Sequence, residues 1–137
     1  MLQVFNHLKG REDSWVIIPF HFINDESPFT GNLKLLLDHI NYEIKKAVLT
    51  VNLQNGDKWS FFINPGKNQV NVLVFSNKKV YIDKKSRSFK ALMLNLQNIG
   101  VKIDDKIYDD TYFDGFYPLF PVEGHNIEGF KTVNTVL

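Results

Sequence analysis

The chain has 137 residues, contains no cysteine and carries a formal net charge of +1. This length suits a single domain with one hydrophobic core, and the lack of cysteine excludes disulfide bonds and thiolate metal ligands. The balanced charge excludes a polycation that coats nucleic acid. We therefore predict one domain over residues 1–137, with a core over 14–101 and an irregular acidic and aromatic C-terminal segment over 102–137.

The N-terminal residues and the longest apolar run argue against export and membrane insertion. Residues 1–13 lack the basic segment and following apolar run of a secretory signal. The apolar run over 15–23 is too short to span a bilayer and contains Pro19 and His21. We therefore expect a soluble, cytoplasmic protein without membrane contact.

The first predicted elements are a strand and a helix. Residues 14–23 are apolar, β-branched and aromatic, as in a buried strand, and Pro19 indicates a break or an edge. After a loop in which Thr30 or Asn32 is expected to cap a helix, apolar residues recur at helical spacing over 33–47. We predict an amphipathic helix there, with Lys34 on its polar face.

From residue 48 onward the pattern changes from helical to alternating. Two apolar runs flank Asn55-Gly56, which is the strongest short signal for a hairpin. A turn over 65–68 leads to a third strand over 69–76, whose two apolar faces predict a central position. A second hairpin at Asn77-Lys78 and a fourth strand over 79–83 are expected to follow.

A second helix is expected to begin after Ser86 or Ser88 and to end before Gly100, which suits the left-handed residue of a helix C-terminus. The predicted fold class is therefore α+β. It consists of an antiparallel meander sheet of four to five strands packed against two helices, followed by an irregular aromatic C-terminal segment.

No catalytic or metal-binding motif is present. The four histidines are not at metal-ligating spacing, and the chain lacks a nucleophile elbow and a phosphate loop. The carboxylate pairs at 104–105 and 109–110 could hold a hard cation, but they do not follow the spacing of a calcium loop. We predict no metal and no cofactor, and we keep a small enzyme using His125 and nearby aspartates as one alternative.

A basic cluster supports a second alternative, a nucleic-acid-binding module. Its residues are placed at the predicted hairpin tip and helix start, where a helix N-terminus favours anions; they are Lys78, Lys79, Lys84, Lys85, Arg87 and Lys90. The predicted helix–strands–helix order over residues 33–99 resembles a double-stranded RNA-binding domain, although four strands are predicted where that family has three. A solvated hairpin end that protects an edge strand explains the same lysines.

The C-terminal segment reverses the charge of the chain. Residues 1–101 hold 13 lysines and arginines against 8 aspartates and glutamates, whereas residues 102–137 hold 3 against 7. Six aromatic residues are interleaved with carboxylates between residues 104 and 123. They can form a lid over the sheet with the carboxylates outward, or they can be displayed as anchors within an acidic rim.

The second interpretation predicts a non-catalytic protein-binding protein. Its most specific form is an immunity or antitoxin-like inhibitor whose acidic, aromatic surface captures a basic partner such as a nuclease toxin. The predicted contact residues are Asp104, Asp105, Asp109, Asp110, Tyr112, Phe113, Asp114, Phe116 and Tyr117.

Overall fold

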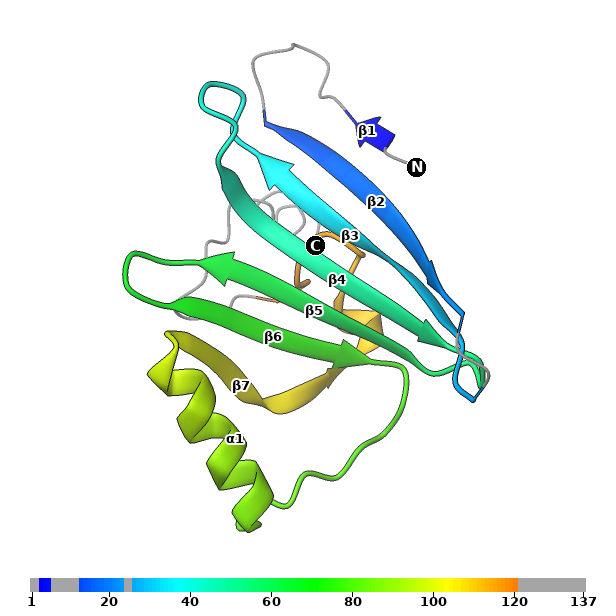
Figure 1. The fold of residues 1–137 in the computed structure, drawn as a ribbon, viewed down its shortest axis with the longest axis vertical. Coiled ribbons are helices and arrows are strands. Elements are labelled where there is room, and N and C mark those ends of the chain that lie inside the picture. The colour runs from blue at the N-terminus through cyan, green and yellow to red at the C-terminus, as the bar shows by residue number, and fades with distance from the viewer. Residues whose placement is uncertain (1–2, 6–12, 24–25, 121–137) are drawn as a thin grey trace.

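A computed structural model describes residues 3–5, 13–23 and 26–120 of the chain (Figure 1). In these residues seven strands form one sheet, in which neighbours in the chain are neighbours in space. All adjacent strands are antiparallel except β6 and β7, which are parallel and are joined through the helix α1. The elements are β1 (Gln3–Phe5), β2 (Ser14–Phe22), β3 (Phe29–Leu37), β4 (Ile44–Leu53), β5 (Lys58–Pro65), β6 (Val70–Ser76), α1 (Arg87–Asn98), β7 (Val101–Asp109) and the 3-10 turn η1 (Asp110–Tyr112).

The predicted fold class is wrong, because the sheet is mixed and larger than expected and the described residues contain one α-helix. The helix predicted over 33–47 is instead the end of β3, a turn over 38–43 and the start of β4. Apolar residues at 33, 35, 36 and 37 satisfy helical and alternating periods equally, because β3 has an apolar side chain on both faces at this end. The resemblance to a double-stranded RNA-binding domain disappears with this helix.

The turn between β3 and β4 is fixed by local hydrogen bonds. Asp38 Oδ1 accepts the backbone N–H of Ile40 at 2.7 Å, and Tyr42 adopts a left-handed φ of 57°. Both features are typical of a turn and interrupt a helix. The chain reverses here, so that Leu35 pairs with Ala47 across the hairpin.

Several local predictions are confirmed. The strand at 14–23 is β2, the turn at Asn55-Gly56 joins β4 to β5, and β6 is a central strand. Ser86 caps α1 by accepting the N–H of Phe89 at 3.1 Å, and Gly100 ends the helix region with a φ of 80°.

The second predicted hairpin is wrong. Residues 77–86 connect β6 to α1 and contain no strand. The side chain of Asn77 forms hydrogen bonds to the hairpin between β4 and β5, so the chain does not turn back along β6. Asn77 Oδ1 accepts the N–H of Lys58 at 2.8 Å, and its Nδ2 donates to the carbonyl of Gly56 at 2.9 Å. β7 then pairs with the side of β6 that does not contact β5. Residues 102–109, which were predicted to be irregular, therefore belong to a strand.

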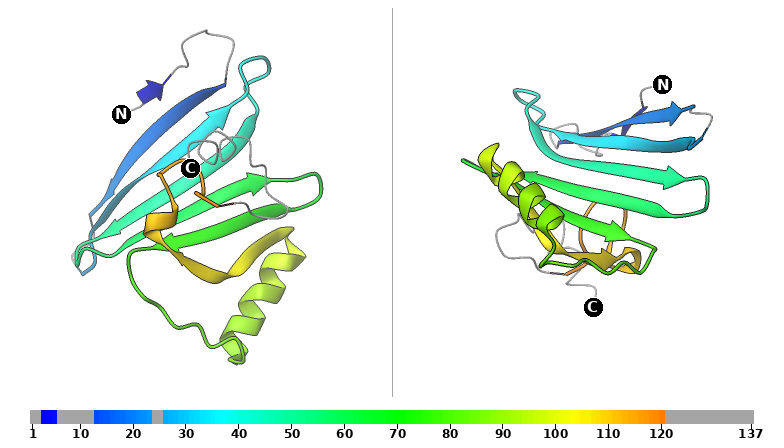
Figure 2. Two further views of the ribbon diagram at one scale, coloured as in Figure 1. Left: turned by 180° about the vertical axis from the view of Figure 1, so that it is seen from behind. Right: turned by 60° about the horizontal axis from the view of Figure 1, so that its bottom comes forward.

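The two faces of the sheet differ. We call residues 110–120 the lid, and the face that they cover the lid face; Figure 2 (left) shows them across this face. The core lies beneath the lid and consists of Trp15, Leu36, Val48, Phe62, Leu73, Phe75 and Phe113. Polar residues buried on this face bond to one another, as Thr50 does to Ser60 at 3.3 Å.

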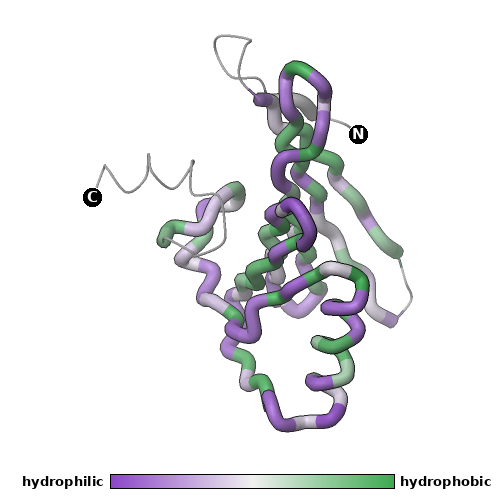
Figure 3. Tube along the Cα trace, turned by 90° about the vertical axis from the view of Figure 1, so that its left-hand side faces the viewer, coloured by the Kyte–Doolittle hydropathy of each residue, from purple (hydrophilic) through white to green (hydrophobic). Residues whose placement is uncertain are grey.

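Helix α1 lies on the side of the sheet opposite the lid, as Figure 3 shows. Hydrophilic and hydrophobic residues alternate along it, its contacts are with β7, and none of its residues is fully buried. Residues 72–76 of β6 are buried on both faces, which confirms the two-sided cover predicted for this strand. Among the described residues, no helix is long and apolar enough to cross a membrane.

Candidate functional site

Most of the predicted aromatic contact residues pack onto the core as part of the lid. Phe113 is 9% exposed and stacks on Phe75 with ring centroids 4.6 Å apart. Phe116 and Tyr117 meet Trp15 edge-on at 4.9 and 5.8 Å. Tyr112 differs, because it is 54% exposed.

The predicted acidic contact residues of the lid stabilise its turns. Asp114 Oδ1 accepts the N–H groups of Phe116 and Tyr117 at 2.8 and 2.7 Å. Asp109 caps η1 by accepting the N–H and hydroxyl of Thr111, both at 2.9 Å, and these bonds lower the pKa of Asp109. The acids therefore have a structural role whether or not a partner contacts them.

Asp110 and Lys34 fasten the lid to the sheet. A carboxylate oxygen of Asp110 lies 3.7 Å from Lys58 Nζ on β5. Lys34 Nζ on β3 donates to the carbonyl of Gly115 at 2.9 Å and lies 4.7 Å from the centre of the Phe116 ring. Burial lowers the pKa of Lys34. The helical interpretation of 33–47 missed this role, since it placed Lys34 on a solvent-facing helix surface.

Asp104 and Asp105 lie in the middle of β7, whereas Asp109 is its last residue and Asp110 and Asp114 belong to the lid. The register between β6 and β7 shifts here, since Val72 pairs with Ile103 but Val74 pairs with Ile107. Asp104 accepts the hydroxyl of Tyr108 at 2.9 Å. Burial, and then this hydrogen bond, raise the pKa of Tyr108 to about 12. A charged irregularity on an edge strand protects that edge from pairing with other chains.

The basic cluster is not separated from the acidic segment. Lys84 lies 3.1 Å from Asp105, and Lys78 lies 3.3 Å from Asp57. The other four residues of the cluster are exposed along the connection and at the start of α1; they are Lys79, Lys85, Arg87 and Lys90.

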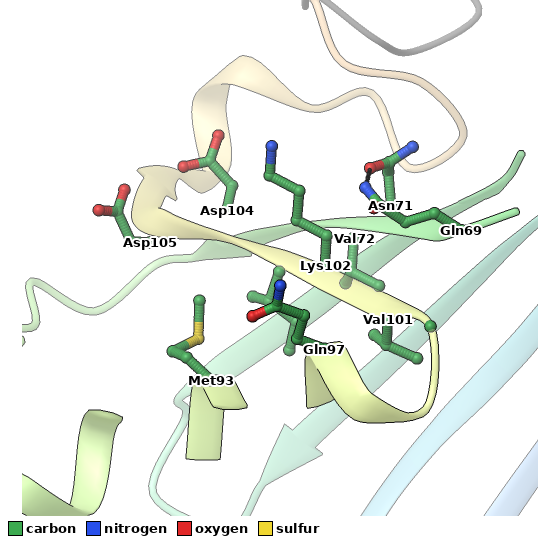
Figure 4. Close-up of a pocket in the computed structure, with 11 residues that line it drawn as sticks. Gln69, Asn71, Val72, Met93, Gln97, Val101, Lys102, Asp104 and Asp105 are labelled. Carbon is green, nitrogen blue, oxygen red and sulfur yellow. Dashed lines mark hydrogen bonds between the residues drawn. The ribbon is translucent and has the colours of Figure 1, made fainter. Parts of the chain in front are cut away.

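A cavity of about 680 Å³ lies between α1 and the edge formed by β6 and β7. Figure 4 shows that β7 divides the residues that line the cavity: Lys102 and Asp104 point to one side, whereas Gln97 and the apolar Met93 of α1 lie on the other. Gln69 is bonded to Asn71 at 2.9 Å. The cavity therefore does not direct its polar groups at one point, as a small-molecule site would.

Histidine and carboxylate groups meet at one place in the described residues. Ligand atoms of Asp13, Asp38 and His39 lie within 4.8 Å of one another. Lys45 Nζ lies 2.7 Å from Asp13 Oδ2 and lowers the pKa of Asp13, so the cluster already contains a cation. His21 is exposed at the end of β2.

The enzymatic alternative depends on a histidine outside the part of the chain that the structure describes. His125 lies outside the described residues, as does His7. Of the described aspartates of the C-terminal segment, Asp104, Asp109 and Asp114 accept the hydrogen bonds given above, whereas Asp105 and Asp110 lie close to lysines.

The sheet face opposite the lid carries a surface that the sequence interpretation did not identify. We call the side chains in the four cross-strand rows that begin at Val16, Ile18, Phe20 and Phe22 of β2 and run toward β5 the open face; Ser14 and its partner Leu37 lie on the same side at the end of β2, outside these rows. The residues of the open face are Val16, Ile18, Phe20, Phe22, Phe29, Leu33, Leu35, Ala47, Leu49, Val51, Leu53, Trp59, Phe61 and Ile63, with Gly31 among them. None of these side chains is charged, and the indole N–H of Trp59 is the one polar group among them.

The open face is only partly buried. Ile18 is 37% exposed, Phe22 57% and Leu53 37%, and every other side chain of the face except Ala47 is at least partly exposed. In Figure 1, which views the sheet from this side, no described helix or loop crosses β2–β5. On the same four strands, the other buried residues all lie on the lid face.

Closely packed aromatic rings lie at one end of the open face. Phe22 stacks on Phe29 with centroids 5.0 Å apart and planes at 2°. The ring of Phe20 lies over Gly31, where a Cβ atom would be 2.6 Å from it and 2.0 Å from the carbonyl oxygen of Thr50. The alternating apolar residues of each strand were the available signal, but they identify a face only once the strands are paired.

The family model described as the TP0910 C-terminal domain matches residues 12–117. No curated protein and no solved structure matches the chain. The match spans β2 to the middle of the lid, and therefore includes both the open face and the elements that close the lid face. The chain belongs to the TP0910 C-terminal domain family.

Proposed function

We propose that this chain is a non-catalytic protein-binding domain that receives its partner on the open face. The observation that carries the proposal is the unbroken apolar surface of β2–β5. With strands about 4.8 Å apart and a rise of about 3.3 Å per residue, four strands of about seven residues cover about 440 Å². Contiguous apolar patches beyond a few hundred Å² are typical of interaction sites.

The chemistry of the open face favours binding over catalysis. It holds no carboxylate, imidazole, amine or hydroxyl, so it offers no group for proton transfer or nucleophilic attack. Apart from the indole N–H of Trp59, it also lacks polar groups that would orient a small substrate. A partner protein with an apolar surface can bury such a face without forming hydrogen bonds to it.

The test replaces two adjacent leucines at the centre of the face. Leu33 and Leu49 are cross-strand partners on β3 and β4, and Leu33→Lys with Leu49→Lys would place two charges there. The matched control is Thr30→Lys with Asn52→Lys, because these residues also pair on β3 and β4 but point to the other face. Circular dichroism establishes that each variant is folded.

We expect the wild type and the control to enhance the fluorescence of the dye ANS, which reports exposed apolar surface. They should also retain the same partner in affinity capture from host cells. The Leu33/Leu49 variant should lose both. A folded Leu33/Leu49 variant that binds dye and partner like the wild type would contradict the proposal.

The immunity or antitoxin-like inhibitor remains a more specific hypothesis. It is supported by Asp105, Asp109, Asp114 and Tyr112, which are exposed in the acidic segment. Asp109→Lys combined with Tyr112→Ala should weaken capture of a basic partner and leave the open face unchanged. Unaltered capture of that partner would place its binding site elsewhere.

Nucleic-acid binding remains the alternative, supported by the exposed basic residues at the start of α1. Changing Lys84, Lys85 and Arg87 to Glu should then abolish binding to a labelled RNA duplex in fluorescence anisotropy. The wild-type affinity should also fall steeply with salt, because phosphate contacts release counterions. Salt-insensitive binding, or none, would remove this alternative.

A further inference from the structure

We infer that the partner on the open face is a second copy of this chain. Two copies would pack β2–β5 against β2–β5 around a twofold axis and form a two-sheet sandwich. This inference rests on the proposed binding function, and it specifies the partner.

The composition of the open face suits contact with itself. In a twofold interface the same patch of both chains is in contact, so a charged residue near the axis would lie close to the same residue of the other chain. The central row of this face, from Ile18 through Leu33 and Leu49 to Phe61, contains no charge. Along this row two such faces exclude water from each other without desolvating a charged group.

Helix α1 does not prevent a second sheet from packing on the open face. Packed sheets lie about 10 Å apart, and an α-helix with its side chains is about 10–12 Å across. Helix α1 lies on the same side as the open face, next to the edge strand β7 (Figures 1 and 3). It would therefore lie beside a partner sheet in one layer and would not cover β2–β5.

The small area of the open face implies that a dimer formed through it dissociates on dilution. The footprint of about 440 Å² is a projection, and the surface of the side chains is larger than the plane they cover. The smallest specific interfaces bury about 600 Å² on each partner. The open face approaches this lower limit and is more apolar than an ordinary interface, which is typical of contacts between identical subunits.

The charges at the ends of the strands argue against a lipid surface as the partner. The turns that border the open face carry four carboxylates, Glu26, Asp38, Glu43 and Asp57, of which Asp57 lies 3.3 Å from Lys78, and one lysine, Lys67. An anionic membrane would repel these carboxylates, whereas membrane-binding faces are bordered by lysine and arginine.

The experiment is analytical ultracentrifugation of the full chain from about 1 to about 200 μM, a range that brackets micromolar dissociation constants. The wild type and the Thr30/Asn52 control should shift from one chain to two chains as concentration rises. The Leu33→Lys, Leu49→Lys variant should stay at one chain throughout. Should it fail to fold, the single change Ile18→Lys, at a 37% exposed position in the same row, replaces it.

The outcomes separate this inference from the proposed function. A wild type that remains a single chain at every concentration overturns the homodimer, as does a dimer that persists in the folded Leu33/Leu49 variant. If the wild type is monomeric but the same variant loses dye binding and a captured partner, the face binds a different protein and the proposed function stands. If the variant changes nothing in any assay, both fail. Face-dependent binding to phosphatidylglycerol vesicles by a monomeric wild type also overturns the homodimer and identifies a lipid partner.

Discussion

At the scale of single residues, the described aspartates of the C-terminal segment form contacts within the chain. Asp109 and Asp114 accept backbone N–H groups at the turns of the lid, and Asp104 accepts the Tyr108 hydroxyl. Composition alone suggested an acidic recognition surface. The sequence does not distinguish a carboxylate that caps a turn from one that binds a partner. Local hydrogen bonding explains these residues without a partner.

Gly31 is the residue at which we expect the smallest change to have a large effect. In Gly31→Ala the new methyl group would meet the carbonyl of Thr50 and the ring of Phe20. Overpacking of this kind costs about 1–3 kcal/mol, and we expect a loss of about 2 kcal/mol or more in the free energy of unfolding. Urea denaturation measures it, with the exposed neighbour Thr30→Ala as the control. Equal midpoints for the two variants would show that the close packing over Gly31 is unimportant.

Tyr108 should make stability depend on pH in the alkaline range. Its pKa is raised from 10.0 in the unfolded chain to about 12 in the folded state. The neutral hydroxyl therefore stabilises the folded state fully below pH 10, and this contribution is lost as pH rises through 12.

The measurement is the urea midpoint of the wild type and of Tyr108→Phe across this pH range. The difference between the two proteins should be constant below pH 10 and should shrink above it. In Asp104→Asn, absorbance titration at alkaline pH should show Tyr108 ionising at lower pH than in the wild type. A difference that does not change with pH would contradict the raised pKa of Tyr108, and an unchanged titration in Asp104→Asn would contradict the contribution of the hydrogen bond from Tyr108 to Asp104.

At the scale of elements, the lid closes one face of the sheet and β3 fixes it in place. Lys34 reaches Gly115 from β3, Phe113 stacks on Phe75 of β6, and Phe116 meets Trp15 of β2. The lid thus joins strands from opposite parts of the sheet. Aromatic residues were predicted either to form such a lid or to remain displayed, and most of those described take the first role.

Two substitutions in the lid should have unequal effects on stability. Phe113→Ala removes a ring that is 9% exposed, and loss of a buried Phe costs about 3–5 kcal/mol. Tyr112→Ala removes a ring that is 54% exposed, so we expect a change within about 0.5 kcal/mol. Thermal or urea denaturation of the two variants checks this contrast. Equal effects would mean that the lid contributes little to the core.

At the scale of the whole molecule, one sheet carries two unlike faces. The lid face is closed within the chain, and its core extends from Trp15 on β2 to Phe75 on β6. The open face is apolar but remains accessible over four strands. A single sheet thus combines one face that the lid covers with one apolar face that the described residues leave partly exposed.

The shared core predicts that the molecule unfolds in one step. Trp15 lies in the core and Trp59 on the open face, so tryptophan fluorescence samples both faces and far-ultraviolet circular dichroism samples the whole sheet. Urea midpoints from the two methods should coincide at low protein concentration. Separate midpoints would indicate that the lid and the sheet open independently.

The sequence by itself determined the local structure. The Asn55-Gly56 turn, the Ser86 cap, the left-handed Gly100 and the alternating strands β5 and β6 are all encoded by short-range patterns. Each depends on the conformational preferences of a few adjacent residues, and these do not require knowledge of the rest of the chain.

Only the tertiary structure decided the identity of residues 33–47 and the roles of the two faces. An apolar run such as 33–37 fits a helix or a strand, and the choice depends on the β2 and β4 residues that pair with it. Whether a ring is buried or displayed depends in the same way on distant segments that cover it. Burial is a non-local property, and it is burial that separates the closed lid face from the open face on which the proposed function rests.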